Sequence, residues 1–461
     1  ALYAAMRLWG MTAYSLWGDE VFSLRAARMP IRDLLGVVAA DAVHPPLFYL
    51  VLKVWVAVGG EALWWLKLLP VATSIAALAP LVLLAREVKL RTEETALAVG
   101  LVAVNPYLVH YAQELRMYSL LMALSIASLW VFLRFLDARG LVWLAALFAV
   151  NLALVYTHYF GWLVVGAEAA AALLLRRDRL AAVAAQAAAI ALCFAPWVWA
   201  ITRDTPGKRG LDQNFRDRPG VADLAGYFGS LDGPASPLWL ALVGIAVFVA
   251  PIALLFWWSR EGEQRSAGWV LLAGMAFGPA LASFAASHVL ANSIWRDRYL
   301  IISAAPYLVL AAAAAWRLPR PWARAAMALA LCAFAVSGAA VGRPTDQRLD
   351  VEGLVTRMLE AERATEGEVR VYAFGWRAYS PVRFYLEQSG EGRFAISRVP
   401  DAADVEGERF WVAYAESRLE KAEDPRSALE ALGYRVGEPF ETGEPGSRLF
   451  LVPVSKGGGA A

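Results

Sequence analysis

Cysteine and histidine are scarce in this sequence. Its 461 residues include two cysteines and four histidines. Cys193 and Cys332 both fall inside apolar stretches, so no disulfide staples a polar domain, and the Cys/His spacing of a zinc site is absent. The sequence also lacks a Walker-type phosphate loop and a glycine-rich dinucleotide fingerprint. These absences exclude the common nucleotide-binding and zinc-module classes, and nothing in the sequence indicates nucleic-acid binding.

Charge is scarce as well, and long apolar runs replace it. Charged residues make up 18% of the chain and hydrophobic residues 59%. The apolar residues recur in blocks of about 18 to 25, the length that crosses a bilayer core. The sequence therefore predicts an all-α polytopic membrane domain with about 11 spans, including a first span of which residues 1–16 are the outer end and which we expect to be cut short. The other spans are predicted at 62–86, 95–112, 117–135, 141–157, 159–175, 180–202, 237–258, 268–287, 299–316 and 323–341.

One apolar piece, 47–58, decides the predicted topology. A helix at Ile31–Val43 mixes apolar and charged positions, as interfacial helices do. His44-Pro45-Pro46 then favours a new helix start, and the short piece that follows carries Lys53. If 47–58 stays on the outer side, five basic loops become cytoplasmic, as the positive-inside rule requires. Those loops are 86–94, 134–140, 176–179, 259–265 and 317–324.

The composition changes after residue 341. From Gly342 onward there are 21 acidic and 16 basic residues, whereas the rest of the chain is net basic. Strand-like runs begin at Val369, Phe410 and Arg448, with helix-like pieces at 343–366, 381–387 and 425–432 between or before them. The sequence predicts a membrane domain at 1–341, with an outer-face loop at 1–61 and a long loop at 203–236. A small extracytoplasmic α/β domain follows at 342–456, and a disordered tail at 457–461.

Asp19 and Glu20 are adjacent carboxylates in a very apolar chain. They can cap the helix that follows them, because acidic side chains favour helix N-termini. Alternatively, one of them is a base that deprotonates an acceptor hydroxyl. Composition alone does not separate these two interpretations.

Further polar residues fall on the predicted outer face. On one helix His110, Glu114 and Tyr118 would share a face; a metal site there is an open but weak alternative, since two ligands are too few. Arg296 and Arg298 either reach lipid headgroups or bind a phosphate. His44 and His158 are either structural or substrate-binding, Lys53 is a lone cation in an apolar piece, and the loop 203–236 is either disordered or a lid.

Five motifs in order resemble a known family. They are Leu16-Trp17-Gly18-Asp19-Glu20, His44-Pro45-Pro46-Leu47-Phe48-Tyr49, Tyr111-Ala112-Gln113-Glu114-Leu115-Arg116-Met117-Tyr118, Thr157-His158-Tyr159-Phe160, and Arg298-Tyr299-Leu300 with Pro306. Over roughly residues 10–320 the sequence resembles the GT-C glycosyltransferases. It is most similar to the bacterial protein-O-mannosyltransferase-like group (glycosyltransferase family 39 type), which includes aminoarabinose transferases.

The resemblance implies transfer of a sugar from a polyprenyl-phosphate-sugar to an acceptor, with inversion. It makes Asp19 the catalytic carboxylate with Glu20 beside it, and Glu114 a second acid near the sugar or acceptor. It favours Arg298 as the phosphate ligand. The remaining candidates are Arg296, Arg116 and Lys53 for the donor phosphate or lipid, and His44, Tyr118, His158 and Tyr299 for substrate.

Two other functions compete with transfer. A transporter or flippase of a lipid-linked sugar would usually show polar or broken spans at mid-membrane, often in repeated halves. Here the ionisable residues cluster at one interface, which favours the enzyme, and the intact acidic pair argues against an inactive scaffold. No cofactor is indicated. The expected partners are the lipid-linked sugar, a lipid, glycan or protein acceptor, and the lipids of a bacterial inner membrane. The sequence leaves the sugar and the acceptor class open.

Overall fold

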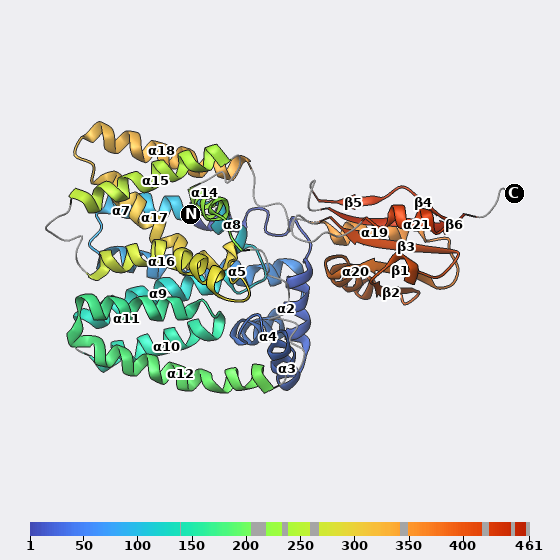
Figure 1. The fold of residues 1–461 in the computed structure, drawn as a ribbon, viewed down its shortest axis with the longest axis horizontal. Coiled ribbons are helices and arrows are strands. Elements are labelled where there is room, and N and C mark those ends of the chain that lie inside the picture. Colours follow the sequence, from blue (N-terminus) through green and yellow to red (C-terminus); the bar gives the residue numbers. More distant parts are fainter. Residues whose placement is uncertain are drawn as a thin grey trace. The chain divides into compact units, whose positions relative to one another are not determined.

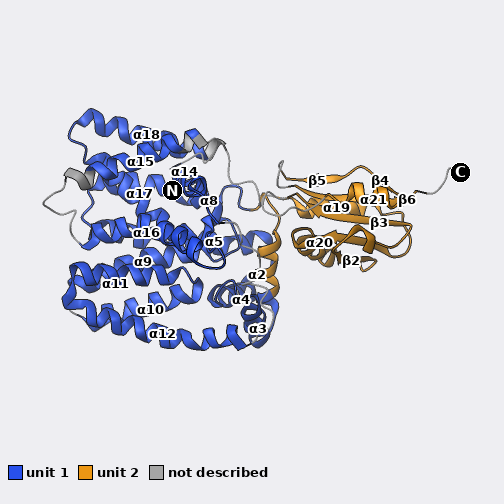
Figure 2. Ribbon diagram, viewed as in Figure 1, with its two compact units in different colours: residues 1–11, 26–343 blue, residues 12–25, 344–461 orange. Residues whose placement is uncertain are grey.

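The structure, a computed structural model, forms two compact units (Figure 2). It describes residues 1–138, 140–203, 218–232, 238–258, 267–341, 349–416, 424–443 and 448–457. The helical unit comprises residues 1–11 and 26–343, and the mixed unit comprises residues 12–25 and 344–461. Helix α2 (Gly18–Arg28) contributes to both, because the division falls after Arg25.

Helices make up the described part of the first unit (Figure 1). In chain order after α2 and the short α1 (Leu2–Leu8), they are α3 (Ile31–Asp41), α4 (Leu47–Gly59), α5 (Leu63–Ala76), α6 (Leu78–Glu87), α7 (Thr92–Val104), α8 (Pro106–Ala112), α9 (Tyr118–Asp137), α10 (Leu141–Thr157), α11 (Gly161–Leu175), η1 (Arg177–Arg179), α12 (Leu180–Arg203), α14 (Val221–Asp232), α15 (Leu238–Trp258), α16 (Ala267–Val289), η3 (Asp297–Leu300), α17 (Ile301–Trp316) and α18 (Pro321–Val341).

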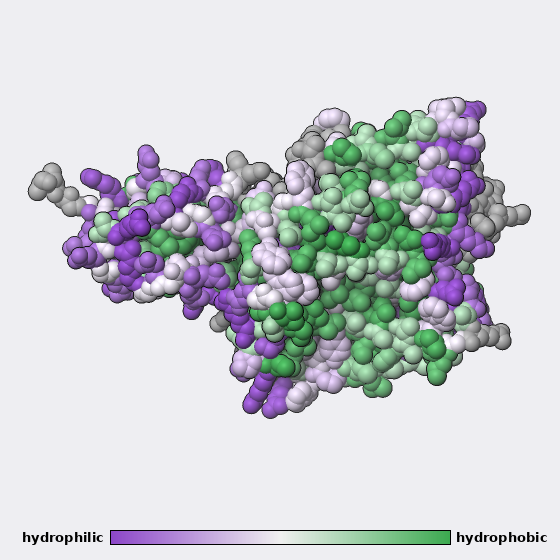
Figure 3. All heavy atoms as spheres, turned by 180° about the vertical axis from the view of Figure 1, so that it is seen from behind, coloured by the Kyte–Doolittle hydropathy of each residue, from purple (hydrophilic) through white to green (hydrophobic). Residues whose placement is uncertain are grey.

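The chain is a multi-pass membrane protein, and the predicted fold class is confirmed. Among the described residues, six helices are long and apolar enough to cross a bilayer, or seven if the bent pair α7–α8 is one span. Four more apolar helices are shorter. Figure 3 shows a broad hydrophobic surface over the helical unit, with hydrophilic side chains gathered along one end. Exposed apolar side chains of the helical unit include Leu174, Leu192, Leu281 and Leu329.

Ion pairs join the basic loops at one end of the helical unit. They link the end of α6 to α9, the end of α9 to the residue after α11, and the start of α7 to the residue after α17. The three pairs are Arg134–Glu87 at 3.6 Å, Arg176–Asp137 at 3.5 Å and Arg317–Glu94 at 2.9 Å. Four of the five loops that the sequence assigns to one side have residues near this end. Which side of the membrane it faces stays a prediction.

Helix α4 starts and finishes away from that basic end. It begins directly after His44-Pro45-Pro46, as predicted. Its Trp55 stacks on Trp65 at the start of α5, with ring centroids 4.3 Å apart, and each indole N–H donates to the other residue's backbone carbonyl. Since α5 and α6 together lead from there to Glu87 at the basic end, α4 returns to the end where it started. This agrees with a piece that does not cross.

The span predicted at 95–112 is broken. Helices α7 and α8 meet at 60°. Asn105 caps α8, because its Oδ1 accepts the Leu108 N–H at 3.0 Å, and Pro106 occupies the first helical position, where no N–H is needed. Arg7, fully buried, donates to the Val102 and Ala103 carbonyls at the end of α7. The expectation of one straight helix was wrong because these polar groups satisfy the broken ends.

The predicted long loop at 203–236 contains a helix instead. Helix α14 forms because Tyr227, Phe228 and Leu231 share a buried face. The Asn105 Nδ2–H donates to the Leu231 carbonyl at 2.7 Å. Most of the rest of that loop, and with it the proposed lid, lies outside the described residues, at 204–217 and 233–236. The predicted tail likewise lies outside them, except Gly457.

A closed ring of hydrogen bonds ties α9, α10 and α11 together. Ser128 Oγ lies 2.5 Å from both Asn151 Oδ1 and Glu168 Oε1, and Asn151 Nδ2 lies 2.7 Å from Glu168 Oε2. All three residues are fully buried. A serine hydroxyl has one hydrogen and an amide oxygen only accepts, so Ser128 donates to Asn151 and receives from Glu168. The donor count therefore makes Glu168 a neutral carboxylic acid.

This ring gives a stability prediction. Glu168→Gln is expected to keep the thermal unfolding midpoint in detergent, because the amide supplies one donor and one acceptor. Glu168→Leu is expected to cost about 1–3 kcal/mol, because it leaves buried polar groups on Ser128 and Asn151 unsatisfied. Equal losses in the two variants would contradict the neutral ring.

The mixed unit is built on a six-stranded sheet of order β2-β1-β3-β6-β4, with β5 also pairing with β6. Strand β1 is parallel to β2 and β3, and β6 is antiparallel to its neighbours. The elements are α19 (Val351–Ala361), β1 (Val369–Phe374), α20 (Trp376–Ser389), β2 (Phe394–Val399), η4 (Ala402–Asp404), β3 (Arg409–Ala415), α21 (Arg426–Ala431), β4 (Tyr434–Val436), β5 (Phe440–Thr442) and β6 (Leu449–Lys456).

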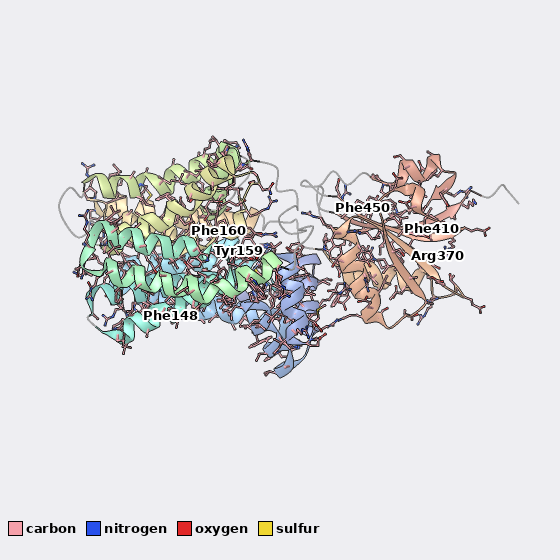
Figure 4. The ribbon with its side chains drawn as sticks, turned by 60° about the horizontal axis from the view of Figure 1, so that its bottom comes forward. Phe148, Tyr159, Phe160, Arg370, Phe410 and Phe450 are labelled. Carbon is pink, nitrogen blue, oxygen red and sulfur yellow. The ribbon has the colours of Figure 1, made fainter. Side chains whose placement is uncertain are left out.

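Successive side chains of a strand point to opposite faces of the sheet, and this explains which residues form the core on one face. In β3, Phe410, Val412 and Tyr414 face one core, which they share with Phe450 of β6. Figure 4 shows Phe410 and Phe450 on these strands. Strands β1, β3 and β6 match the three predicted runs. Strands β2, β4 and β5 were not predicted from the sequence. They are short or largely exposed, so they lack the buried, alternating face by which a strand is recognised.

Candidate active site

Six polar side chains from separate segments gather in the helical unit. We call them the cationic cluster: His44 before α4, Arg116 and Tyr118 at the start of α9, His158 between α10 and α11, and Arg298 and Tyr299 in η3. Their rings pack directly. The His44 ring centroid lies 5.1 Å from that of His158 and 5.6 Å from that of Tyr299, and those of His158 and Tyr299 are 4.6 Å apart. The structure thus brings together six of the predicted site residues.

Two arginines give the cluster its charge. The Arg116 Nη2 group lies 3.2 Å from His44 Nδ1, and its Nη1 group lies 3.5 Å from the Tyr49 hydroxyl. The Arg298 guanidinium lies 6.0 Å from the Tyr118 ring centroid and 5.7 Å from that of Tyr299. Arg116 is 3% exposed. A guanidinium stays charged at any ordinary pH, so the buried Arg116 brings a permanent positive charge into the cluster.

His44 and His158 each have a ring N–H that can donate a hydrogen bond. An arginine only donates, so His44 Nδ1 accepts from Arg116. His158 Nδ1 accepts the Phe160 N–H at 3.0 Å. Each ring therefore carries its hydrogen on Nε2, and neither Nε2 has a hydrogen-bond partner among the described residues. The Tyr118 and Tyr299 hydroxyls are likewise unpartnered within that part of the chain. The cluster thus combines two cations with four groups able to donate a hydrogen bond.

Burial keeps the histidines neutral. It lowers the pKa of His44 well below its usual value, and Arg116, His158 and Arg298 lower it further. Burial lowers the pKa of His158 to about 3, with Arg116 and Arg298 adding to the effect. Figure 4 marks the segment that holds His158 by its neighbours Tyr159 and Phe160.

The lowered histidine pKa predicts loss of stability in acid. Below about pH 6.5 the unfolded chain binds protons at these histidines while the folded chain does not, down to about pH 3 for His158. The neutral His158 then costs the folded state on the order of 1 kcal/mol per pH unit in this window, and His44 acts in the same direction. His158→Asn, which keeps an acceptor for the Phe160 N–H, is expected to flatten the fall of the unfolding midpoint between pH 7 and pH 5. The exposed His288→Asn is the matched control, and an unchanged slope in His158→Asn would contradict the assignment.

Glu114 lies close to the cationic cluster, but it does not share a helix face with His110 and Tyr118 as predicted. The chain leaves α8 at Ala112 and turns before Tyr118, so His110, Glu114 and Tyr118 do not share one helix face. The straight-helix expectation was wrong because α8 ends at Ala112, two residues before Glu114 and six before Tyr118. Glu114 is nevertheless 4% exposed and acts electrostatically on Tyr118, as do Arg116 and Arg298. A carboxylate therefore stands among the cations.

Two tyrosines that the sequence did not single out hold Arg298 in place. The Tyr107 hydroxyl donates to the Asp297 carbonyl at 2.6 Å, and the Tyr227 hydroxyl donates to the Leu300 carbonyl at 2.8 Å. These bonds fix the backbone on both sides of Arg298 and Tyr299. No motif could reveal them, because their partners are backbone atoms far away in the chain.

Lys53 and Arg296 have other surroundings. The Lys53 ammonium donates to the carbonyls of Ala27 and Met29, at 3.2 and 2.7 Å, and so caps the C-terminal end of α2. This explains a cation in an apolar helix without a phosphate. Arg296 is half-buried and its charge acts on Asp297. Phosphate binding by either residue stays a prediction.

The acidic pair lies in the mixed unit, in the first turn of α2. Glu20 is 1% exposed, and its Oε2 accepts the Trp17 N–H at 3.2 Å, which caps the helix. Asp19 is half-buried, and its carbonyl accepts from the Ser23 hydroxyl. The two carboxylates thus differ: Glu20 has the capping position, while Asp19 lies one residue closer to the helix start. Among the described residues, no group of three or more His, Cys, Asp or Glu could hold a metal ion.

Known structures share this fold. No family model matches the sequence, and no curated protein gives a significant match. The crystal structure of ArnT from Cupriavidus metallidurans bound to undecaprenyl phosphate has 14% sequence identity and a TM-score of 0.58, covering 98% of this chain and 96% of that chain. The chain has the GT-C fold. Apo ArnT matches similarly, at 14% identity and a TM-score of 0.57 over 95% and 94% of the two chains. The GT-C resemblance seen in the sequence is therefore confirmed as a resemblance of fold.

Proposed function

We propose that this GT-C chain is an inverting glycosyltransferase that uses a polyprenyl-phosphate-linked sugar as donor. The observation that carries the proposal is the cationic cluster, which offers two guanidinium groups and four further donors to one anion. A lipid phosphate satisfies that chemistry, and ArnT, a protein with the same fold, was crystallised with undecaprenyl phosphate.

The reaction needs a base and an anion site. The Asp19 carboxylate takes the proton from the acceptor hydroxyl as the acceptor oxygen bonds to the anomeric carbon. The bond from that carbon to the phosphate oxygen breaks, and its electron pair leaves with polyprenyl phosphate. Attack opposite the leaving group inverts the anomeric configuration. Glu114 is the second acid, and its proposed place is near the sugar or acceptor.

The arginines act on the leaving group. The donor is a phosphodiester with one negative charge, and the departing lipid phosphate gains a second as the bond breaks. Arg298 and Arg116 therefore interact more strongly with the transition state than with the bound donor, which lowers the barrier. The neutral histidines and the Tyr118 and Tyr299 hydroxyls add hydrogen bonds without adding charge.

The proposed site opens to the outer face of a bacterial inner membrane. The basic loops joined by Arg134, Arg176 and Arg317 are at one end of the helical unit, and the positive-inside rule assigns that end to the cytoplasm. The cationic cluster, with its neutral histidines, is made by segments that connect the opposite helix ends. The acceptor is a lipid, a glycan or a protein.

A flippase of a lipid-linked sugar is the second candidate, because the cluster would also bind the phosphate of an intact lipid. The experiment is to reconstitute the protein in liposomes with a polyprenyl-phosphate-sugar radiolabelled in the sugar, together with a membrane extract as acceptor source. If the protein is a transferase, the labelled sugar leaves the lipid phosphate for the acceptor, and polyprenyl phosphate is released. Label that crosses the bilayer while still attached to the lipid would favour the flippase and overturn the proposal.

A further inference from the structure

The segment that carries the acidic pair is held by α19 and α20 of the same unit. The Leu16 N–H donates to the Tyr385 hydroxyl at 2.7 Å. The Ser15 hydroxyl donates to Asp350 Oδ1 at 3.3 Å and accepts the Glu352 N–H at 3.1 Å. These contacts lie immediately before the first turn of α2, and they join parts of the chain more than 330 residues apart.

A fourth contact lies farther along α2. Arg25 and Glu387 form an ion pair at 2.8 Å. Asp19 lies between the two anchored points, three residues after Leu16 and less than two turns before Arg25. Leu16 precedes the helix by only two residues, and the helix itself is rigid from Gly18 to Arg25, so anchoring both sides restricts the direction in which the Asp19 side chain leaves the helix.

The surroundings of Tyr385 favour its hydrogen bond with the Leu16 N–H. It is 7% exposed, and Leu16 is 2% exposed, so their hydrogen bond is shielded from water. Its hydroxyl is the acceptor of a backbone N–H that lies at the helix entrance, where intrahelical partners are lacking. The Tyr385 ring packs edge-on against Phe384, at 5.1 Å between centroids, so loss of the hydroxyl leaves the ring supported.

We propose that the C-terminal segment 344–461 is a positioning element for the catalytic carboxylate, and that Tyr385 is its principal positioning residue. The inference rests on the proposed function. A base must come within hydrogen-bond distance of the proton that it removes, and a misplacement of about 1 Å costs on the order of 100-fold in rate. The C-terminal segment therefore sets the rate of transfer without touching the lipid phosphate.

The test compares two tyrosine variants of the full chain. Tyr385→Phe removes the acceptor of the Leu16 N–H. Tyr372→Phe is the matched control, because Tyr372 lies in the same unit and its hydroxyl likewise accepts a backbone N–H, that of Glu406 at 3.2 Å. Three quantities are measured in each: deuterium uptake by the peptide that covers residues 12–25, kcat for sugar transfer, and the dissociation constant of the donor.

Tyr385→Phe is expected to raise the uptake by that peptide and to lower kcat by about 10- to 100-fold. Donor affinity is expected to stay within about twofold, since the arginines of the cationic cluster are untouched. Tyr372→Phe is expected to match the wild type in deuterium uptake by that peptide, in kcat and in donor affinity. An unchanged kcat, an unchanged uptake, or a fall in donor affinity as large as the fall in kcat would overturn the inference.

A surface pair tests the same idea if Tyr385→Phe does not fold. Arg25→Gln removes the ion pair with Glu387, whereas Glu387→Gln removes that pair and also the pair with Arg383 within α20. Glu391→Gln, which breaks the exposed pair with Arg393, is the control. Arg25→Gln and Glu387→Gln are each expected to lower kcat by about two- to fivefold, and the double variant no further than Glu387→Gln alone, because both remove the same contact of α2. Additive losses, or none, would overturn the inference.

Asp19→Asn separates this inference from the proposed function. Full transfer by Asp19→Asn refutes the proposed function itself. Loss of transfer in Asp19→Asn together with wild-type kcat in Tyr385→Phe refutes only the positioning role.

Discussion

Asp19→Asn is expected to lower sugar transfer by about 10²- to 10⁴-fold, the usual contribution of a general base. Asparagine has the same shape but cannot take the acceptor's proton. Donor affinity is expected to stay close to that of the wild type, because the lipid phosphate is held by arginines. The measurement is kcat and the donor dissociation constant in the reconstituted system.

Two other carboxylates make that experiment sharp. Asp33 lies exposed in the first turn of α3, so Asp33→Asn is the matched control and is expected to keep wild-type transfer. Glu20→Gln keeps an oxygen that can accept the Trp17 N–H, so it preserves the helix cap and tests the chemical role of Glu20 alone. Wild-type activity in Asp19→Asn would remove Asp19 from the mechanism.

Arg298→Ala is expected to weaken donor binding by about 10- to 150-fold, because a hydrogen bond to a charged group contributes about 1.5–3 kcal/mol. Arg298→Lys keeps the charge but loses the two-pronged geometry of the guanidinium, so an intermediate loss is expected. The measurement is the dissociation constant of a polyprenyl phosphate in detergent.

An arginine at a helix end provides the control for Arg298. Arg203 ends α12, and its guanidinium lies 4.8 Å from the Trp199 ring centroid, as expected of a side chain at a membrane surface. Arg203→Ala is expected to leave donor binding unchanged. If Arg298→Ala behaves in the same way, Arg298 only reaches lipid headgroups and has no phosphate role.

Features set by local sequence were predictable. Apolar blocks of bilayer length become helices wherever they occur, and α4 begins at Leu47 because two prolines precede it. The break at Asn105 was not predictable in the same way, since it depends on Arg7 and on the Leu231 carbonyl, which the fold brings near. Helix α14 was missed because its buried face is short and charged residues surround it in the sequence.

In the candidate site, too, residues in local motifs were predicted and residues that act through long-range contacts were missed. The members of the cationic cluster were named because their motifs resemble a family, not because their spacing predicts contact. The residues that support the site were missed: Tyr107, Tyr227 and Tyr385 each bond to a backbone atom between 70 and 370 residues away. Such pairings carry no local signature. Lys53 is the opposite case. The sequence singles it out as a lone cation in an apolar piece, but in the structure it caps the end of α2.

The proposed mechanism is tested most directly by an experimental structure of the full chain with polyprenyl phosphate bound. We expect phosphate oxygens within hydrogen-bond distance of Arg298 or Arg116, with His44 and His158 Nε2 turned toward them. We also expect the Asp19 carboxylate on the side from which an acceptor would approach the anomeric carbon. A lipid phosphate bound by neither arginine would refute the proposed phosphate site.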